Sequence, residues 1–362
     1  KVFIDGSAGT TGLRIFDRLH GRTDIQLLTL PESERKLESS RKRLLNEADV
    51  VFLCLPDDAA REAASWVENP DTVVLDTSTA HRTAPGWCYG FPELSPVQEA
   101  RLRQAKRIAV PGCHASGFIA LVYPLIYAGL LAPDVLLSCY SLTGYSGGGK
   151  KMIAEYRAPE RSPLLNAPRQ YALGQTHKHL KEMKAVTGLA SEPVFCPVVA
   201  DFYSGMQVTV PLFAGWLKPG AGMEEVKNAY KALYTGPVVS YTDAVDEGGF
   251  LSAAAQSGLD SMKITVAGNE QRMLLLAVYD NLGKGASGAA DTPHGWSLLT
   301  PAMINKAVTI MKKNRVPRIN GYYYAVIHPS VAHDLRQDEG WIEAHKYAAP
   351  DALFNGEIGE LH

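Results

Sequence analysis

The stretch KVFIDGSAGTTGLRIFDRLHGR, residues 1–22, decides the fold of this chain. An apolar β run leads into glycines spaced three apart, at Gly6, Gly9 and Gly12, and an amphipathic helical pattern follows. This order suits the pyrophosphate of a dinucleotide, because glycine lets the backbone approach the phosphates and the helix N-terminus offers free N–H groups. The spacing GxxGxxG departs from the usual GxGxxG, and a turn that only needs positive φ would also use glycine. The position directly after the first strand favours the dinucleotide.

The alternation of strands and helices continues over the first hundred residues. Buried strands are expected at residues 24–30, 49–56 and 72–78, which is typical of a Rossmann-like, doubly wound parallel sheet in an α/β fold. After residue 113 the predicted strands lack a regular helix between each pair, so an α+β domain with a mostly antiparallel sheet is expected.

These changes of pattern predict three regions. A dinucleotide-binding domain is expected over residues 1–113 and 270–290, and a catalytic and oligomerisation domain over residues 114–269. Residues 291–362 are expected to form an additional C-terminal α/β extension.

The composition excludes several classes of protein. Of 362 residues, 46% are hydrophobic, and 36 basic residues stand against 38 acidic ones, so nothing favours nucleic acid or an acidic membrane as a partner. No apolar run reaches the roughly 18–20 residues needed to cross a bilayer, and a cytoplasmic protein is expected. Five cysteines without a CxxC pair argue against a disulfide framework and a zinc cluster, and no metal is expected.

The residues after the second predicted strand bear on the choice of dinucleotide. An acidic residue there would bind a free ribose 2′-hydroxyl, but LPESERK offers a hydroxyl and two cations, at Ser33, Arg35 and Lys36. These groups suit a 2′-phosphate, so NADP is favoured over NAD, although Glu32 is near enough to leave NAD open.

A second glycine cluster, TGYSGGGKK at residues 143–151, nearly matches the nucleoside-triphosphate loop GxxxxGK[ST]. Lys151 stands where that motif needs a hydroxyl group to hold magnesium, so a kinase or ATPase is not favoured. Backbone N–H groups beside a lysine still form an anion nest, and Ser146, Gly147 and Lys150 are candidates to hold a phosphate. A flexible loop is the alternative.

The stretch VPGCHASG, residues 110–117, places Cys113 ahead of a segment with helical apolar spacing. A thiol at a helix N-terminus is expected to have its pKa lowered from about 8.5 towards neutrality, which would make it a nucleophile. A structural cysteine at a turn is the alternative.

The stretch GQTHKHLKEM, residues 174–183, adds His177, His179 and Glu182. On a helix, His179 and Glu182 share a face, so the carboxylate is expected to hold the imidazole in one tautomer and raise its basicity. A cysteine and a histidine beside a nicotinamide suit one reaction. The thiolate captures an acyl group as a thioester, hydride converts the thioester to an aldehyde, and the histidine relays protons.

Eight ordered blocks over residues 1–290 resemble N-acetyl-γ-glutamyl-phosphate reductase in its shorter variant: GSAGTTG, CLPDDAA, DTSTAHR, YGFPEL, PGCHASG, GYSGGGK, THKHLKEM and DNLGKGASGAA. The resemblance implies an enzyme of arginine biosynthesis. This enzyme would reduce N-acetyl-L-glutamyl 5-phosphate with NADPH to N-acetyl-L-glutamate 5-semialdehyde, release phosphate, and form a dimer or tetramer.

The resemblance also implies roles for single residues. Cys113 would be the nucleophile and His179 the acid/base, with His177 as the fallback. The pyrophosphate would be held by Gly9, Thr10, Thr11 and Gly12. The nicotinamide end would lie near Ser78, Asn281 and Gly283. Charge makes Arg82 and Lys150 candidates for the acyl phosphate and the carboxylate.

Two features depart from the family. Lys181 stands where the family usually has proline, and residues 291–362 follow where a short apolar helix normally ends the chain. Those last residues faintly resemble a segment of tailed-phage major capsid proteins. Two alternatives stay open. One is an aspartate-semialdehyde dehydrogenase-like enzyme, which shares the architecture and the cysteine chemistry, and the other is a non-enzymatic assembly or shell protein with an inactive reductase portion.

Overall fold

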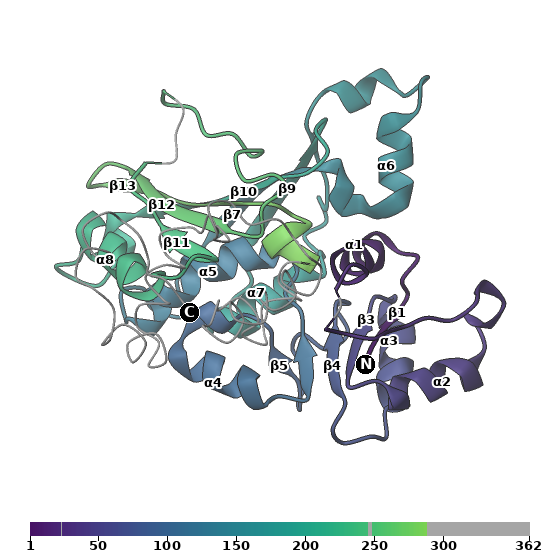
Figure 1. Cartoon of the computed structure of the whole chain (residues 1–362). Helices are drawn as coiled ribbons and strands as arrows, with labels where there is room; N and C mark the ends of the chain where they lie inside the picture. Colours follow the sequence, from purple (N-terminus) through teal and green to yellow (C-terminus); the bar gives the residue numbers. More distant parts are fainter. Residues whose placement is uncertain (23, 245–247, 288–362) are drawn as a thin grey trace, which may run out of the picture. The chain divides into compact units, whose positions relative to one another are not determined.

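The computed structural model describes residues 1–22, 24–244 and 248–287, which belong to one compact unit, Lys1–His294. The expected extension over residues 291–362, with its resemblance to capsid proteins, lies outside the described residues. The described residues form two β-sheets, the first from strands before residue 110 and the second from strands after residue 137 (Figure 1).

The first sheet is six-stranded and parallel throughout. Its order is β2 (Leu27–Leu28), β1 (Val2–Asp5), β3 (Val50–Leu53), β4 (Val73–Asp76), β6 (Arg107–Ala109) and β5 (Cys88–Tyr89). The helices that cover its two faces are α1 (Thr10–Leu19) and α4 (Pro96–Gln104) on one, and α2 (Glu38–Glu47) and α3 (Asp57–Ser65) on the other. Successive side chains of β1 point to opposite cores, since Ile4 packs with α1 and Phe3 with α2. The predicted doubly wound parallel sheet is confirmed.

The second sheet is seven-stranded. Its order is β11 (Val239–Tyr241), β12 (Met262–Gly268), β13 (Arg272–Tyr279), β10 (Met206–Phe213), β7 (Ser138–Gly144), β9 (Val194–Ala200) and β8 (Arg169–Gln170). Four of its pairings are antiparallel and two are parallel, which confirms the mostly antiparallel sheet.

The boundary expected at residue 270 differs from the structure. β13 pairs with β10 on one side and β12 on the other, so its backbone groups are satisfied inside the second sheet. After β13, the helical segment Gly283–Ser287 contacts α1 of the dinucleotide-binding region.

Helices cover one face of the second sheet (Figure 1). Helix α5 (Cys113–Tyr127) packs against β10 and β13, α8 (Met223–Leu233) packs against β12, and α7 (His179–Thr187) packs against α5. α5 is buried almost all round, as expected for a helix between a sheet and other helices. This packing fixes the N-terminus of α5, where Cys113 lies.

A further helix, α6 (Gly149–Arg157), follows β7.

Among the helices of the described residues, none is long and apolar enough to cross a membrane.

Candidate active site

The glycine turn after β1 can accept a pyrophosphate. Gly6 has φ +87°, and a Cβ on it would lie 2.3 Å from the Cys54 carbonyl oxygen. A Cβ on Gly12 would lie 2.4 Å from the Gly6 carbonyl oxygen, so the turn can close on α1 only with glycine at both positions. Gly9 caps α1, which starts at Thr10 and has no side-chain cap and no acidic residue in its first turn. Its first N–H groups therefore remain available to phosphate oxygens.

The residues expected at the 2′-phosphate are solvent-exposed. Ser33, Arg35 and Lys36 lie in or next to a short 3₁₀ turn, Glu32–Glu34, beyond the end of β2. β2 pairs with β1, the strand that leads into the glycine turn. Glu32 is exposed in the same turn.

A cavity of about 290 Å³ brings together many of the predicted site residues. The predicted residues that line it are Thr11, Arg82, Cys113, Ser146, Gly147, His177, His179 and Asn281. Residues that were not predicted also line it, among them Thr77, His114, Tyr171, Lys178 and Gly285. The two stretches around the thiol and the histidines thus meet at one site.

The Cys113 thiol lines this cavity at the first turn of α5. Burial raises the pKa of Cys113 above its ordinary value, while the Arg82 guanidinium and the backbone N–H of His114 act in the opposite direction. The expected lowering of the thiol pKa is therefore wrong, because desolvation outweighs both favourable contacts.

The two histidines stand ring to ring. Their centroids are 4.7 Å apart at an angle of 81°, and the backbone N–H of His179 donates to Nδ1 of His177 over 3.2 Å. Burial lowers the pKa of His177 to about 4 and that of His179 well below its ordinary value. Both imidazoles are therefore neutral near pH 7, and the same burial makes them weaker bases than an imidazole in water. Nδ1 of His179 is buried without a hydrogen-bond partner among the described residues.

Glu182 does not hydrogen-bond to a histidine. It binds the turn that precedes Cys113. Its Oε1 accepts hydrogen bonds from the Tyr89 hydroxyl (2.6 Å) and the Gly112 N–H (2.7 Å), and its Oε2 accepts one from Nη1 of Arg82 (2.9 Å). The expectation that Glu182 orients His179 and raises its basicity is wrong on both counts. A guanidinium, a phenol and a backbone amide occupy the oxygens of Glu182, and burial lowers the pKa of His179.

Gly112 lies where three polar groups converge. A Cβ on Gly112 would lie 2.3 Å from Arg82 Nη1, 2.6 Å from His179 Nε2 and 2.8 Å from Glu182 Oε2. Only glycine therefore leaves room for guanidinium, imidazole and carboxylate beside the residue that precedes Cys113.

Arg82 is braced by the protein itself. Its Nε donates to the Val110 carbonyl (2.9 Å) and its Nη2 to the Thr77 carbonyl (3.1 Å), in addition to the Glu182 contact. Lys178, an exposed residue of the cavity lining, carries the more accessible positive charge. Lys150 is exposed at the start of α6 and is not among the lining residues.

The remaining predicted residues lie at or next to the cavity. Asn281 Nδ2 donates to the Ser146 hydroxyl over 3.0 Å, which joins two lining residues. The Ser78 hydroxyl donates to Asp76, and Ser78 is not among the lining residues. Gly283 lies in the turn after β13 outside the lining, whereas Gly285 lines the cavity close to Cys113.

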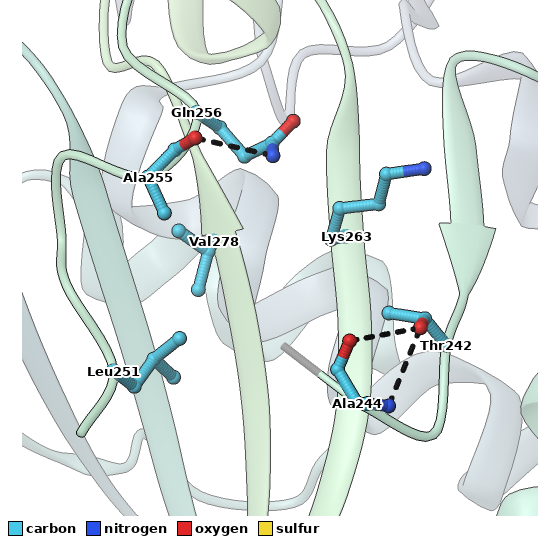
Figure 2. A pocket seen from close by; sticks show the side chains of 7 residues that line it. All are labelled: Thr242, Ala244, Leu251, Ala255, Gln256, Lys263 and Val278. Atoms are coloured by element: carbon cyan, nitrogen blue, oxygen red, sulfur yellow. Dashed lines mark hydrogen bonds between the residues drawn. The ribbon is translucent and has the colours of Figure 1, made fainter. Parts of the chain in front are cut away.

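A second, smaller cavity of about 200 Å³ lies on the opposite face of the seven-stranded sheet (Figure 2). It is lined by Thr242, Ala244, Leu251, Ala255, Gln256, Lys263 and Val278. The Lys263 ammonium donates to the Ser240 hydroxyl over 2.9 Å, and the lining contains no thiol, imidazole or carboxylate. No group of three or more His, Cys, Asp or Glu side chains within the described ranges could hold a metal ion.

Comparison with known proteins decides the family. Two protein-family models match, "Semialdehyde dehydrogenase, NAD binding domain" over residues 1–102 and "Semialdehyde dehydrogenase, dimerisation domain" over residues 113–281. N-acetyl-γ-glutamyl-phosphate reductase of Trichormus variabilis is 45% identical over 302 residues, covering 80% of this chain and 94% of the relative. The enzyme of that name from Rhizobium meliloti is 45% identical over 297 residues, covering 80% of this chain and 96% of the relative. The chain belongs to the N-acetyl-γ-glutamyl-phosphate reductase family.

Solved structures share the fold of this family member. Aspartate semialdehyde dehydrogenase II of Vibrio cholerae, complexed with ASA, aligns with TM-score 0.62 at 16% identity, covering 81% of this chain and 96% of that one. Aspartate semialdehyde dehydrogenase with NADP from Candida albicans aligns with TM-score 0.55 at 16% identity, covering 85% and 99%. At this identity they support the fold alone, so the aspartate-semialdehyde dehydrogenase alternative fits less well than the reductase family.

His114 is the clearest site residue of this family member that sequence reasoning missed. Its Nδ1 lies 2.6 Å from the Ser141 hydroxyl and its Nε2 lies 2.7 Å from the Tyr171 hydroxyl, and its ring packs beside His177 and His179. Its position in the PGCHASG block was the only available signal, since Ser141 and Tyr171 are remote in the chain.

We expect the stability of the protein to fall in mild acid because of His114. Burial lowers the pKa of His114 to about 3, whereas an unfolded histidine titrates near 6.5. Below that value the unfolded chain binds a proton that the folded chain does not, so this residue lowers the free energy of unfolding by about 1.4 kcal/mol per pH unit. Urea unfolding between about pH 7 and 5 measures the slope.

The variant His114→Gln removes the titrating ring, so its slope should be shallower by this amount even if it is less stable at neutral pH. The exposed His20→Gln serves as the matched control and should keep the wild-type slope. A wild-type slope in His114→Gln would contradict a neutral buried imidazole.

Proposed function

We propose that this chain reduces N-acetyl-L-glutamyl 5-phosphate with NADPH to N-acetyl-L-glutamate 5-semialdehyde and phosphate, a step of arginine biosynthesis. The observation that carries the proposal is the cavity in which Cys113 meets His177 and His179, in a chain 45% identical to reductases of that name. The other alternative, an assembly or shell protein, does not account for a cavity lined by a thiol and two imidazoles.

The first chemical step belongs to Cys113. Its sulfur attacks the acyl carbon of the substrate, the bond from that carbon to the phosphate oxygen breaks, and a thioester remains on Cys113. NADPH, when bound, supplies the hydride that takes the acyl group to the aldehyde level. Releasing the aldehyde from sulfur frees Cys113 for the next cycle.

His179 is our choice for the proton transfers. It is neutral because burial lowers its pKa, and its Nε2 lies over Gly112, next to the nucleophile. A neutral imidazole has one unprotonated nitrogen, and from this position that nitrogen can accept the thiol proton as sulfur attacks and return a proton later. His177, which also lines the cavity, remains the fallback.

The glycine turn and the cavity divide the remaining tasks. Backbone N–H groups from Thr10 to Gly12 would hold the NADP pyrophosphate, beside Gly9, whose own N–H donates to the Gly6 carbonyl oxygen. Ser33, Arg35 and Lys36 would hold the 2′-phosphate. We assign the anionic ends of the substrate to Lys178, with Ser146, Gly147 and the braced Arg82 around it. The cofactor region is then residues 1–112, and the substrate region begins at Cys113.

The open face of the second sheet suits self-association. Tyr140, Phe213 and Leu274 are 53%, 51% and 42% exposed on the face opposite α5, which makes an apolar surface. A matching family model is described as a dimerisation domain, so we propose a homo-oligomer, a dimer or tetramer, joined through this face. The five cysteines are unpaired, which supports a reducing, cytoplasmic location.

The variant Cys113→Ser tests the reaction. Incubation of the aldehyde, NADP and phosphate with the wild-type protein should form NADPH, and the variant should lose at least about 10³-fold in rate because the nucleophile is gone. Cys196→Ser is the control, since Cys196 is half-buried on β9 and does not line the cavity. Equal rates in wild type and Cys113→Ser would remove the thiol from the mechanism.

The pair Lys178→Ala and Lys150→Ala tests where the substrate charge is bound. Both lysines are exposed, but only Lys178 lines the cavity. Lys178→Ala should raise KM for the acyl phosphate by about tenfold, as expected for one lost charge-assisted contact, and Lys150→Ala should stay within about twofold. The reverse pattern would place the anion at the glycine cluster of α6.

The surface proposed for self-association is tested by Leu274→Asp. A charge in the middle of the face should lower the molar mass measured by light scattering to that of one chain. Val97→Asp is the control, because Val97 is 66% exposed on α4, away from this face. An unchanged mass in Leu274→Asp would exclude this face as the interface.

A further inference from the structure

Three buried tyrosine hydroxyls donate to backbone carbonyls of α5. Tyr230 donates to Leu121 over 2.6 Å, Tyr234 donates to Ala120 over 2.7 Å, and Tyr279 donates to Cys113 over 2.5 Å. All three side chains are at most 3% exposed. Tyr230 and Tyr234 contact the helix about two turns beyond the thiol, whereas Tyr279 contacts the nucleophile's own peptide group.

The Tyr279 hydroxyl makes a second contact that Tyr230 and Tyr234 lack among the described hydrogen bonds. It accepts the N–H of Gly117 over 3.0 Å while it donates to the Cys113 carbonyl. Cys113 C=O and Gly117 N–H are the two groups that an α-helix joins directly in its first turn. The hydroxyl therefore bridges the hydrogen bond on which the geometry of that turn depends.

Gly117 makes the room for this bridge. A Cβ on Gly117 would lie 2.6 Å from the Tyr279 oxygen and 2.6 Å from Cγ2 of Val208. Any larger residue at 117 would push the hydroxyl out of the helix. Tyr279 is itself 0% exposed at the end of β13, so its ring cannot swing aside without opening the core.

We propose that Tyr279 is a positioning residue for the Cys113 sulfur, acting through the first turn of α5. The proposal rests on the assignment of Cys113 as nucleophile. Glu182 fixes the Gly112 N–H on one side of the thiol, and Tyr279 fixes the Cys113 carbonyl on the other. The peptide group that follows Cys113 is thus held by a side chain from β13, and the peptide group between Pro111 and Gly112, one residue before it, is held by a side chain from α7.

Loss of the Tyr279 hydroxyl should change the orientation of the Cys113 sulfur. Without the bridge, the turn relaxes towards a direct bond between Cys113 and Gly117, and the Cα to Sγ direction shifts. The backbone N–H of His114, which favours the thiolate, then meets the sulfur less well. Small displacements of a reacting atom are enough to cost about tenfold to a hundredfold in rate.

The variant Tyr279→Phe tests the proposal, with Tyr234→Phe as the matched control. Both variants lose one buried hydroxyl that donates to a carbonyl of α5, so their melting temperatures should fall by similar amounts. Only Tyr279→Phe should lower kcat, by about tenfold or more, with KM for NADP within about twofold of wild type.

A second readout needs no reductase activity. The rate at which iodoacetamide alkylates Cys113, followed by peptide mass spectrometry against pH, reports the thiol directly. In Tyr279→Phe the profile should move to higher pH, and in Tyr234→Phe it should match wild type. An inactive wild type would refute the proposed reaction while leaving this comparison intact.

Two outcomes would overturn the proposal: an unchanged kcat and alkylation profile in Tyr279→Phe, or equal losses in both variants. If Tyr279→Phe does not fold, Gly117→Ala displaces the same hydroxyl and should give the same loss of kcat and shift of profile. In a folded Tyr279→Phe background, Gly117→Ala should cost less than in wild type, because the hydroxyl that it displaces is already gone. Equal costs in both backgrounds would contradict the bridge.

Discussion

The turn at Gly112 is the constraint on which the site depends. It joins β6 of the first sheet to α5 of the second, and its N–H is held by a carboxylate, Glu182, that is 2% exposed. Such a buried charge is tolerated only when it is paired and its oxygens are fully used. Arg82 supplies the charge and Tyr89 the remaining hydrogen bond, so residues of the first sheet and of α7 are tied to one peptide group.

Burial sets the protonation of the resting site. It raises the pKa of the Cys113 thiol and lowers those of His177 and His179, which favours a neutral thiol beside neutral imidazoles. This arrangement avoids an exposed, oxidisable thiolate between turnovers. The attack then needs a proton acceptor close to sulfur, and the position of His179 Nε2 over Gly112 meets that need.

Sequence reasoning reached the parts of the site that depend on local pattern. The glycine turn after β1, the thiol at the start of α5 and both histidines could be placed from strand, turn and helix signals. It was wrong about Glu182, because helical spacing shows which side chains share a face but not which group will hydrogen-bond to the carboxylate. Two of the groups that do, on Arg82 and Gly112, lie 100 and 70 residues away in the chain. Lys178 was overlooked for a related reason, since only the folded cavity separates it from Lys150.

The chain after β13 returns from the second sheet to the dinucleotide-binding region. Tyr279 reaches the first turn of α5, and Asp280, the next residue, accepts hydrogen bonds from Ser204, Gly258, Leu282 and Gly283. These contacts bend the chain back so that Gly285 packs against Cys113, while the buried Lys284 next to it forms an ion pair with the half-buried Glu93. A strand assigned by sequence to the cofactor region is therefore a member of the second sheet, and the segment that follows it, Gly283–Ser287, contacts α1. The nucleophile lies where the two meet, and its position is set by core packing as much as by the residues that touch substrate.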